Sequence, residues 1–272
     1  MMSAPQTRPP AVAGMFYAAS AEHLLADVDA LLADTVASAM TPKALIVPHA
    51  GYIYSGAVAA SAYALLAPLR DRVRRVVLFG PAHRVALRGL ALPEADFFAT
   101  PLGAVPIDGE AAEIALRLPN VVRSAGAHAA EHSLEVQIPF LQRTLGAFSL
   151  LPFVVGQTSA AAVAAVIEAF WGGPETLLLI SSDLSHYHPY GEARRLDQGT
   201  VDDILALNPL ADHEQACGAT PINGLLEVAR RRGLAPHLLD LRNSGDTAGD
   251  KSRVVGYAAV AFSAAKGSAD GH

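Results

Sequence analysis

The segment TLLLISSDLSHYH, residues 176–188, changes character at its midpoint. Its first half, Thr176–Ser181, is a short apolar run, which is typical of a strand buried inside a sheet. Its second half is polar and includes Asp183 and His186. In open α/β sheets, ligands bind beyond the carboxyl ends of the strands. The segment therefore predicts a buried strand and a candidate functional site directly after it.

Two other apolar runs end in the same way. Ala44–Val47 is followed by a Pro-His-Ala-Gly-Tyr sequence that contains His49, and Arg75–Phe79 is followed by a Gly-Pro-Ala-His sequence that contains His83. Proline restricts the local backbone, and glycine lets the backbone approach a ligand closely. Both properties suit a side chain that must be held rigidly beside a ligand. Because histidine is a common metal ligand and acid–base group, His49 and His83 are candidate site residues.

The rest of the chain alternates between strand and helix patterns. Further strands are expected at Ser149–Val155, Val254–Phe262 and, with a weaker pattern, Pro236–Leu241. Helices are expected after Ser20, over Ser55–Leu69, Glu131–Leu145, Ser159–Phe170, Tyr190–Leu207 and Pro221–Arg232. This alternation predicts an α/β domain whose helices cover both faces of a sheet.

Composition excludes several classes of protein. Of 272 residues, 51% are hydrophobic and 17% are charged, which is enough apolar material for a large core and rules out a disordered chain. No apolar run reaches the roughly 20 residues of a membrane span. The net charge of -6 argues against sequence-independent nucleic-acid binding. With one cysteine and no apolar signal core in residues 1–10, we expect a reducing, cytoplasmic location.

Two further segments offer alternatives. Residues 128–132, HAAEH, have the spacing of an inverted zinc-peptidase motif, but we expect the helix to begin near Glu131 and to leave His128 in a loop. The polar loop 243–253 could bring Asp246 or Asp250 to the histidines, and two histidines with one carboxylate form the facial triad of non-haem Fe(II) sites. Cys217 precedes a helix whose N-terminus could lower a thiol pKa, but a lone cysteine is more often buried and inert.

Several of these segments together resemble the Memo family. The matching stretches are Gly14–Tyr17, Pro48–Tyr52, Tyr54–Gly56, Gly80–His83, Glu131–Glu135, Ser181–His186 and Gly256–Ala258. The resemblance implies one domain over about residues 8–263, with flexible termini at 1–7 and 264–272. It also implies a single-domain α/β fold with a central mixed sheet, similar to that of class III extradiol dioxygenases.

The resemblance carries further expectations about the site. It implies metal ligands at His49 and His83, with His186 lining the site. In animal members the third ligand is a cysteine of the C-terminal loop; here that loop has no cysteine, and Asp246, Thr247 or Asp250 stands there. The chain is most similar to the prokaryotic branch, AmmeMemoRadiSam system protein B, which implies radical SAM and AMMECR-type partners.

Together, the residues and the resemblance predict a metal-dependent, dioxygenase-like oxidoreductase whose substrate is not specified. The expected metal is Fe(II), with Cu or Zn as alternatives, held by His49, His83 and Asp246. The expected catalytic residues are His186, Glu131 and His132, and the expected substrate-binding residues are Tyr52, Tyr54, Asp183 and Glu135. The alternative function is a non-catalytic metal- or peptide-binding partner of a radical SAM/AMMECR-type system.

Overall fold

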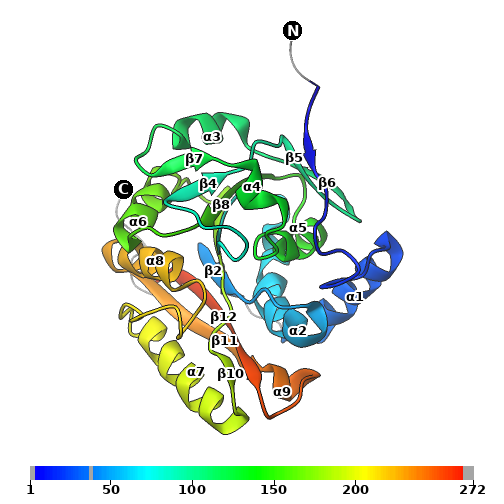
Figure 1. The fold of residues 1–272 in the computed structure, drawn as a ribbon, viewed down its shortest axis with the longest axis vertical. Coiled ribbons are helices and arrows are strands. Elements are labelled where there is room, and N and C mark those ends of the chain that lie inside the picture. Colours follow the sequence, from blue (N-terminus) through cyan, green and yellow to red (C-terminus); the bar gives the residue numbers. More distant parts are fainter. Residues whose placement is uncertain (1–3, 37–38, 266–272) are drawn as a thin grey trace.

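A computed structural model describes residues 4–36 and 39–265. Its main feature is a nine-stranded mixed sheet in the order β10-β12-β2-β9-β3-β8-β4-β7, with β11 paired to β12 (Figure 1). The strands of this sheet are β2 (Ala44–Val47), β3 (Arg75–Pro81), β4 (Leu90–Leu92), β7 (Val121–Arg123), β8 (Ser149–Val155), β9 (Thr176–Ser181), β10 (His186–His188), β11 (Leu234–Asn243) and β12 (Val254–Ala264). The predicted single-domain α/β fold with a mixed sheet is confirmed.

The centre of the sheet is parallel and its flanks are antiparallel. Strand β9 pairs in parallel with β2 on one side and β3 on the other, and β3 continues in parallel to β8. On the flanks, β12 is antiparallel to β2 and β4 is antiparallel to β8. The three strands that precede the polar segments are therefore neighbours whose carboxyl ends lie at the same edge.

Helices cover both faces of this sheet. On one face lie α1 (Ala21–Ala33), α2 (Tyr52–Tyr63), the 3-10 helix η1 (Ala64–Leu69) and α5 (Ile138–Thr144). On the other lie α3 (Gly109–Ala115), α6 (Ala160–Ala169), α7 (Tyr190–Leu205) and α8 (Ala219–Arg232). Figure 1 shows the two groups of helices on opposite sides of the strands.

Each face of the sheet packs against its helices in a separate hydrophobic core. The central strands contribute side chains to both cores, because successive side chains of a strand point to opposite faces. In β9, Leu177 and Leu179 join the core under α2, whereas Leu178 and Ile180 join the core under α6 and α8. All four are at most 1% exposed. A strand that is buried on both faces has a continuous run of apolar residues. Thr176–Ser181 could therefore be recognised as a strand although its apolar and polar residues do not alternate.

Short elements that the sequence did not predict complete the fold. A three-stranded sheet is formed by β1 (Thr7–Arg8), β5 (Phe97–Thr100) and β6 (Gly103–Pro106). Small helices occur at α4 (Ala125–Ala129), η2 (Glu135–Gln137) and α9 (Ser244–Thr247). Thr7 and Ala264, which we expected in flexible termini, belong to β1 and β12; residues 1–3 and 266–272 of those termini lie outside the described residues.

The predicted helix over Glu131–Leu145 is wrong in its first turns. Helix α4 ends at Ala129, a turn follows, and helical structure resumes at Glu135 as η2 before α5 begins at Ile138. The turn is fixed by polar contacts, since Ser133 Oγ donates a hydrogen bond to the Pro81 carbonyl and the Ser133 carbonyl accepts one from Ser181 Oγ. These bonds attach the turn to the carboxyl ends of β3 and β9.

Among the described residues, one stretch, Tyr52–Leu69, is long and apolar enough to cross a membrane by length and composition. It comprises α2 and η1, and residues such as Val58, Ala62 and Leu66 are fully buried in the core against the sheet. We therefore interpret it as a core helix.

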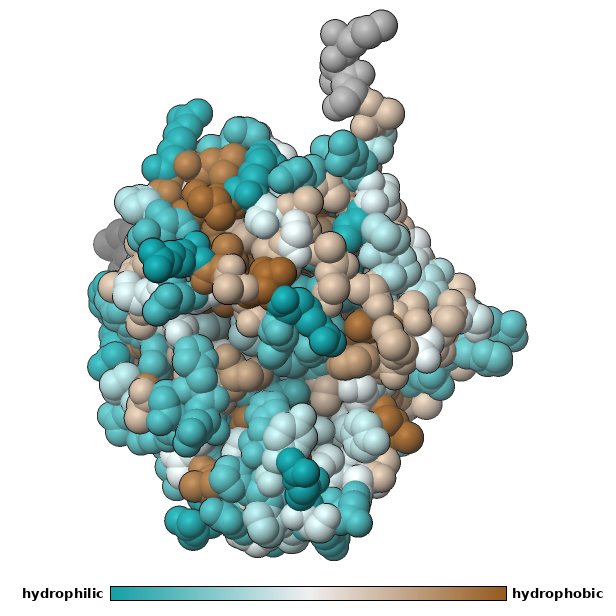
Figure 2. All heavy atoms as spheres, viewed as in Figure 1, coloured by the Kyte–Doolittle hydropathy of each residue, from teal (hydrophilic) through white to brown (hydrophobic). Residues whose placement is uncertain are grey.

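Figure 2 shows a mostly hydrophilic face, with apolar side chains gathered around α3 and β7, where Ile114 and Val122 are exposed.

Gly80 is where β3 meets the turn before η2. A Cβ placed on Gly80 would lie 2.6 Å from Ser133 Oγ and 2.9 Å from Leu134 Cδ2, so Gly80→Ala must push the turn away from the strand. We expect the variant to lose about 1–3 kcal/mol of unfolding free energy, as other overpacked cores do. Urea denaturation measures the loss. The matched control is Gly109→Ala, whose added Cβ meets nothing within 4 Å; equal losses in both variants would contradict the prediction.

Candidate metal centre

Three strand ends place the polar residues of the site. His49 lies two residues beyond the end of β2, His83 two residues beyond β3, and Asp183 two residues beyond β9. Because these three strands are parallel neighbours, their following residues converge at one edge of the sheet.

A third histidine, from a segment outside the sheet, lies close to His49 and His83. His132 belongs to the turn before η2, and one ring nitrogen from each of His49, His83 and His132 lies within 4.8 Å of the other two. Their ring centroids are 4.7–5.4 Å apart. Four-coordinate metal sites built on three histidines need this kind of convergence. We call these three residues the His cluster.

Hydrogen bonds determine which nitrogen His49 presents. Ser181 Oγ donates its proton to the Ser133 carbonyl and accepts from Gln137 Nε2, so its contact of 2.8 Å with His49 Nδ1 requires a proton on that nitrogen. His49 Nε2 then carries a lone pair. This is the tautomer that binds a metal through Nε2.

Glu131 fixes His83 in the same way. Its carboxylate accepts hydrogen bonds from His83 Nδ1 at 2.9 Å, from the His83 backbone N–H at 2.7 Å and from the Ser133 N–H at 2.9 Å. Burial alone raises the pKa of Glu131, but these hydrogen bonds lower it to about 2. The ionised carboxylate therefore holds a proton on Nδ1 and leaves Nε2 of His83 free, the arrangement typical of metal-bound histidines.

The rings of His49 and His132 are in the neutral state that ligation requires. Burial, reinforced by the neighbouring histidines, lowers the pKa of His49 well below its ordinary value. Burial also lowers the pKa of His132 to about 4. Neutral imidazoles bind metals, whereas imidazolium ions cannot. His132 Nδ1 is buried and has no hydrogen-bond partner in the described part of the chain.

Asp183 and Cys217 surround His49. Asp183 Oδ1 accepts a hydrogen bond from the His49 backbone N–H at 2.7 Å, and burial raises the pKa of this carboxyl to about 7. Cys217 Sγ lies 3.3 Å from His49 Nε2. Burial, with Asp183 nearby, raises the pKa of Cys217 to about 12, so the sulfur is a neutral thiol at neutral pH.

An open pocket of about 490 Å³ lies beside the His cluster. His132, Asp183 and His186 line it, as do Phe16 and Tyr54. Burial lowers the pKa of His186, so its ring is neutral at pH 7. The pocket can therefore present a neutral histidine and an aromatic wall to a molecule bound next to the cluster.

Two predicted substrate-binding residues are corrected by the structure. Tyr52 is 9% exposed, and its hydroxyl donates a hydrogen bond to the Val136 carbonyl inside the core. Glu135 is fully buried and does not line the pocket; its carboxylate accepts hydrogen bonds from Arg8, the Ala11 and Val12 N–H groups and Tyr17. Both residues support the pocket wall instead of contacting its contents.

Two predicted catalytic residues also change role. Glu131, which is 1% exposed, stands behind His83 and does not line the pocket, so it positions the His83 ring. His132 belongs to the His cluster itself. The segment 131–135, which the sequence singled out, lies beside His49 and His83, but its two carboxylates do not line the pocket.

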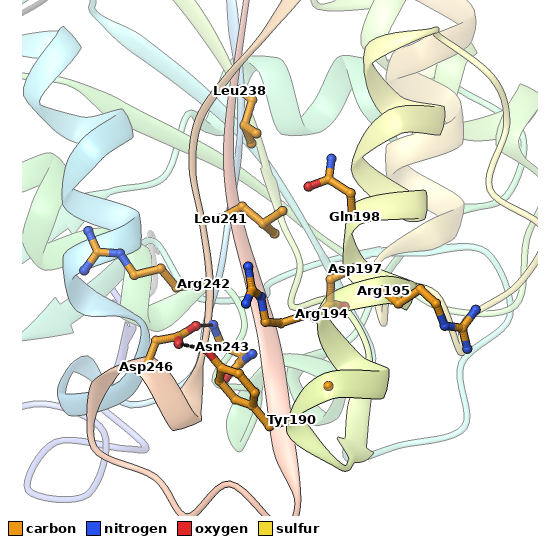
Figure 3. A pocket seen from close by; sticks show the side chains of 11 residues that line it. Tyr190, Arg194, Arg195, Asp197, Gln198, Leu238, Leu241, Arg242, Asn243 and Asp246 are labelled. Carbon is orange, nitrogen blue, oxygen red and sulfur yellow. Dashed lines mark hydrogen bonds between the residues drawn. The ribbon is translucent and has the colours of Figure 1, made fainter.

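Asp246, the predicted third ligand, is not part of the His cluster. It lies at the third position of α9, where it accepts a hydrogen bond from the Asn243 N–H at 3.0 Å and another from the Tyr190 hydroxyl (Figure 3). Figure 3 shows Asp246 in a separate pocket between α7 and β11. We therefore replace Asp246 by His132 in the proposed ligand set.

The two alternatives for that position do not join the cluster either. Thr247 donates its hydroxyl to the Ser244 carbonyl within α9. Asp250 lines the pocket but is outside the His cluster, and its carboxylate caps the Ser252 N–H.

The inverted peptidase motif does not form. His128 lies in α4 instead of the expected loop, and the helix ends before Glu131 and His132, so the three side chains do not share a helical face. His128 is 2% exposed, and its Nε2 bonds the Ala91 carbonyl at 2.8 Å. Its role is therefore structural.

Comparison with known proteins agrees with this architecture. The family profile described as "Memo-like protein" matches residues 8–261. The chain belongs to this family. A Memo-family relative, the "MEMO1 family protein" of Aquifex aeolicus (strain VF5), is 38% identical over 270 residues, covering 94% of this chain and 99% of the relative. A second, from Ignicoccus hospitalis, is 38% identical over 280 residues, with 94% and 98% covered. A third, from Methanosarcina acetivorans, is 35% identical over 269 residues, with 94% and 98% covered.

The buried His128 of this Memo-like chain predicts a loss of stability in acid. Burial lowers its pKa to about 4, whereas the unfolded chain takes up this proton near pH 6.5. Because the unfolded state then binds more protons, unfolding is favoured as pH falls from about 6.5 to 4, by roughly 3 kcal/mol at the lower limit. His128→Gln keeps a donor for Ala91 and removes the titration.

Urea denaturation at several pH values tests this expectation. The pH dependence of the unfolding free energy between 6.5 and 4 should become shallower in His128→Gln than in wild type. His23→Gln, which changes an exposed histidine of α1, is the control. An unchanged slope in the His128 variant would show that this histidine is not the acid-sensitive group.

Proposed function

We propose that this Memo-like protein binds one divalent transition metal at His49, His83 and His132. We further propose that it uses the metal to transform a small molecule bound in the adjoining pocket. The observation that carries the proposal is the convergence of one ring nitrogen from each of three histidines within 4.8 Å beside a pocket of about 490 Å³. The hydrogen bonds that fix His49 and His83 as Nδ1–H tautomers support it.

The donor set suits several metals. Imidazole ligands bind Fe, Cu and Zn. Fe(II) is the metal we propose, because the resemblance to extradiol dioxygenases points to non-haem iron. Three histidines without a carboxylate depart from the two-histidine, one-carboxylate triad of such iron sites, so Zn and Cu are the competing metals. A redox-active metal bound here would supply Lewis-acid polarisation and electron exchange with oxygen.

The residues of the pocket divide the remaining work. His186 lines the pocket without belonging to the His cluster, and as a neutral imidazole it can accept a proton from a bound substrate. Tyr54 and Phe16 offer aromatic surface, and Phe16 packs against His132 with ring centroids 4.9 Å apart. An oxidoreductase acting on an aromatic or apolar small molecule in a cytoplasmic setting fits this arrangement.

A second candidate is a binding function without turnover. Met15 and Ile53, at the pocket, are 72% and 70% exposed, and Tyr187 beside them is 63% exposed. Exposed apolar side chains gathered at one site are typical of protein contacts. They favour a peptide or protein partner, and we propose the radical SAM and AMMECR-type proteins as candidates.

Metal content tests the ligand set directly. We expect wild-type protein reconstituted anaerobically with Fe(II) to hold close to one iron per chain, and His132→Ala and His49→Ala/His83→Ala to lose most of it. Asp246→Asn should retain iron, because Asp246 bonds Asn243 and Tyr190 instead of the cluster. If Asp246→Asn lost its iron and His132→Ala kept it, the ligand set would be the one first predicted, His49, His83 and Asp246. Competition with Zn and Cu identifies the preferred metal.

His186 separates catalysis from binding. His186→Phe should hold metal as wild type does, because this side chain is outside the His cluster, while oxygen consumption with a pocket-bound substrate falls by roughly 10²–10⁴-fold, the usual contribution of an acid–base group. Oxygen-electrode assays across a panel of catecholic and other aromatic substrates provide the readout. Metal binding without turnover on any substrate would favour the non-catalytic function.

A further inference from the structure

We propose that Arg253 binds the carboxylate of an aromatic ligand in the pocket beside the His cluster. The inference rests on the proposed function and deepens it, because it names the class of small molecule: an aromatic ring that carries one carboxylate. Arg253 directly precedes β12 and lines the pocket of about 490 Å³ together with Phe16 and Tyr54. It belongs to the polar loop 243–253, from which a metal ligand was expected.

The guanidinium of Arg253 has no hydrogen-bond acceptor or ion-pair partner within residues 4–36 and 39–265. Among the described residues that line the pocket, it is also the only arginine or lysine. The two carboxylates of the lining have other partners. Asp250 accepts a hydrogen bond from the Ser252 N–H, and Asp183 accepts one from the His49 N–H. The five N–H donors of a permanent positive charge are therefore available to a ligand.

Tyr187 holds this guanidinium at the pocket. Arg253 Cζ lies 5.1 Å from the centroid of the Tyr187 ring, within the range of a cation–π contact. The pairing of β10 with β12 places both residues, since Tyr187 directly precedes His188 and Arg253 directly precedes Val254, and these two successors are paired. An arginine that is already held over a ring loses less side-chain freedom when it binds a ligand, so the contact preorganises the cation.

The backbone of Tyr187 is strained, as it often is at functional sites. Its φ is +64°, in the left-handed region that residues other than glycine rarely adopt, and the β10–β12 ladder shifts register between His186 and His188. The Tyr187 ring is 63% exposed at the pocket, and its centroid lies 5.7 Å from that of the His186 ring. Tyr187 therefore contacts both the proposed proton acceptor, His186, and the cation, Arg253.

The charge of the lining favours a carboxylate over a phosphate. One guanidinium can bind a carboxylate through two parallel hydrogen bonds. A phosphate with close to two negative charges would meet a single arginine and share the pocket with Asp250, whose pKa is lowered by hydrogen bonds from Ser252 and which is therefore ionised. The rings of Phe16 and Tyr54 offer a surface for the apolar body of the ligand. The expected ligand is an arylcarboxylate.

Pairs of compounds that differ in charge but hardly in shape test the inference. Benzoate, 4-hydroxybenzoate and phenylacetate are each compared with the corresponding neutral amide. Isothermal titration calorimetry on the full chain, both metal-free and loaded with redox-inert Zn²⁺, gives each Kd without turnover. In both states we expect the wild-type protein to bind the carboxylates more tightly than the amides, by roughly 10–100-fold, the contribution of hydrogen bonds between charged groups.

Arg253→Gln is the matched variant. It should bind the amides as the wild type does but lose most of the preference for carboxylates. Arg253→Lys keeps the charge without the planar fork and should retain part of the preference. Arg195→Gln is the control, because it removes an exposed arginine of the separate pocket between α7 and β11. In wild type, a bound carboxylate should also protect Arg253 from phenylglyoxal, as mapped by mass spectrometry.

The outcomes separate this inference from the proposed metal site. Wild-type protein that binds carboxylates no more tightly than amides, or binds neither at millimolar concentration, would overturn the role of Arg253, while metal content would still report on the His cluster. A preference that survives in Arg253→Gln and requires Zn²⁺ would place the carboxylate on the metal and would also overturn it. Tighter binding of phenyl phosphate than of benzoate would contradict the carboxylate class. A chain that binds no metal but keeps an Arg253-dependent preference would overturn the metal function and support the anion site.

Discussion

The site depends on the parallel pairing of β2, β9 and β3. Parallel strands end at a common edge, so residues that are distant in sequence, such as His49, His83 and Ser181, meet without any loop having to cross the sheet. Because the strands are buried on both faces, a one-residue shift in register would exchange their side chains between the two cores and disrupt the packing of both. The positions of His49 and His83 therefore depend on the rigid packing of the core, as the groups of a proposed metal centre require.

Two buried carboxylates connect this edge to the rest of the chain. Glu131 accepts three hydrogen bonds from His83 and Ser133 and thereby orients the His83 ring. Glu135 forms an ion pair with Arg8 at 2.6 Å and holds the N-terminal segment in place. This segment packs Phe16 against His132. Removing one partner of such a buried ion pair would leave an uncompensated charge, so the pair is costly to separate. It therefore holds the N-terminal segment, which forms one wall of the pocket, against the segment that carries His132.

The central strands and the α/β class could be predicted because buried strands leave local patterns. The same patterns pointed to His49 and His83, which the structure brings close together. The place of His132 beside them could not be predicted, because His132 and Asp246 both lie in segments whose paths are set by tertiary contacts: the Ser133 bonds to β3 and β9 for one, and the N-terminal capping of α9 for the other. A helix was expected over Glu131–Leu145, but helical structure resumes only at Glu135, and Glu131 and Glu135 accept hydrogen bonds from different parts of the chain. The environment of Cys217 was equally hidden, since its neighbour His49 is 168 residues away.

The position of β12 has a consequence for how the chain acquires its structure. This C-terminal strand is antiparallel to β2, β10 and β11, so β2 lacks its partner on one side until residues 260–262 are available. The segment that carries His49 therefore comes long before the strand that completes the sheet beside it. Long sequence separation between paired strands slows folding, so the edge that carries His49 and His83 becomes complete only after residues 260–262 have paired with β2.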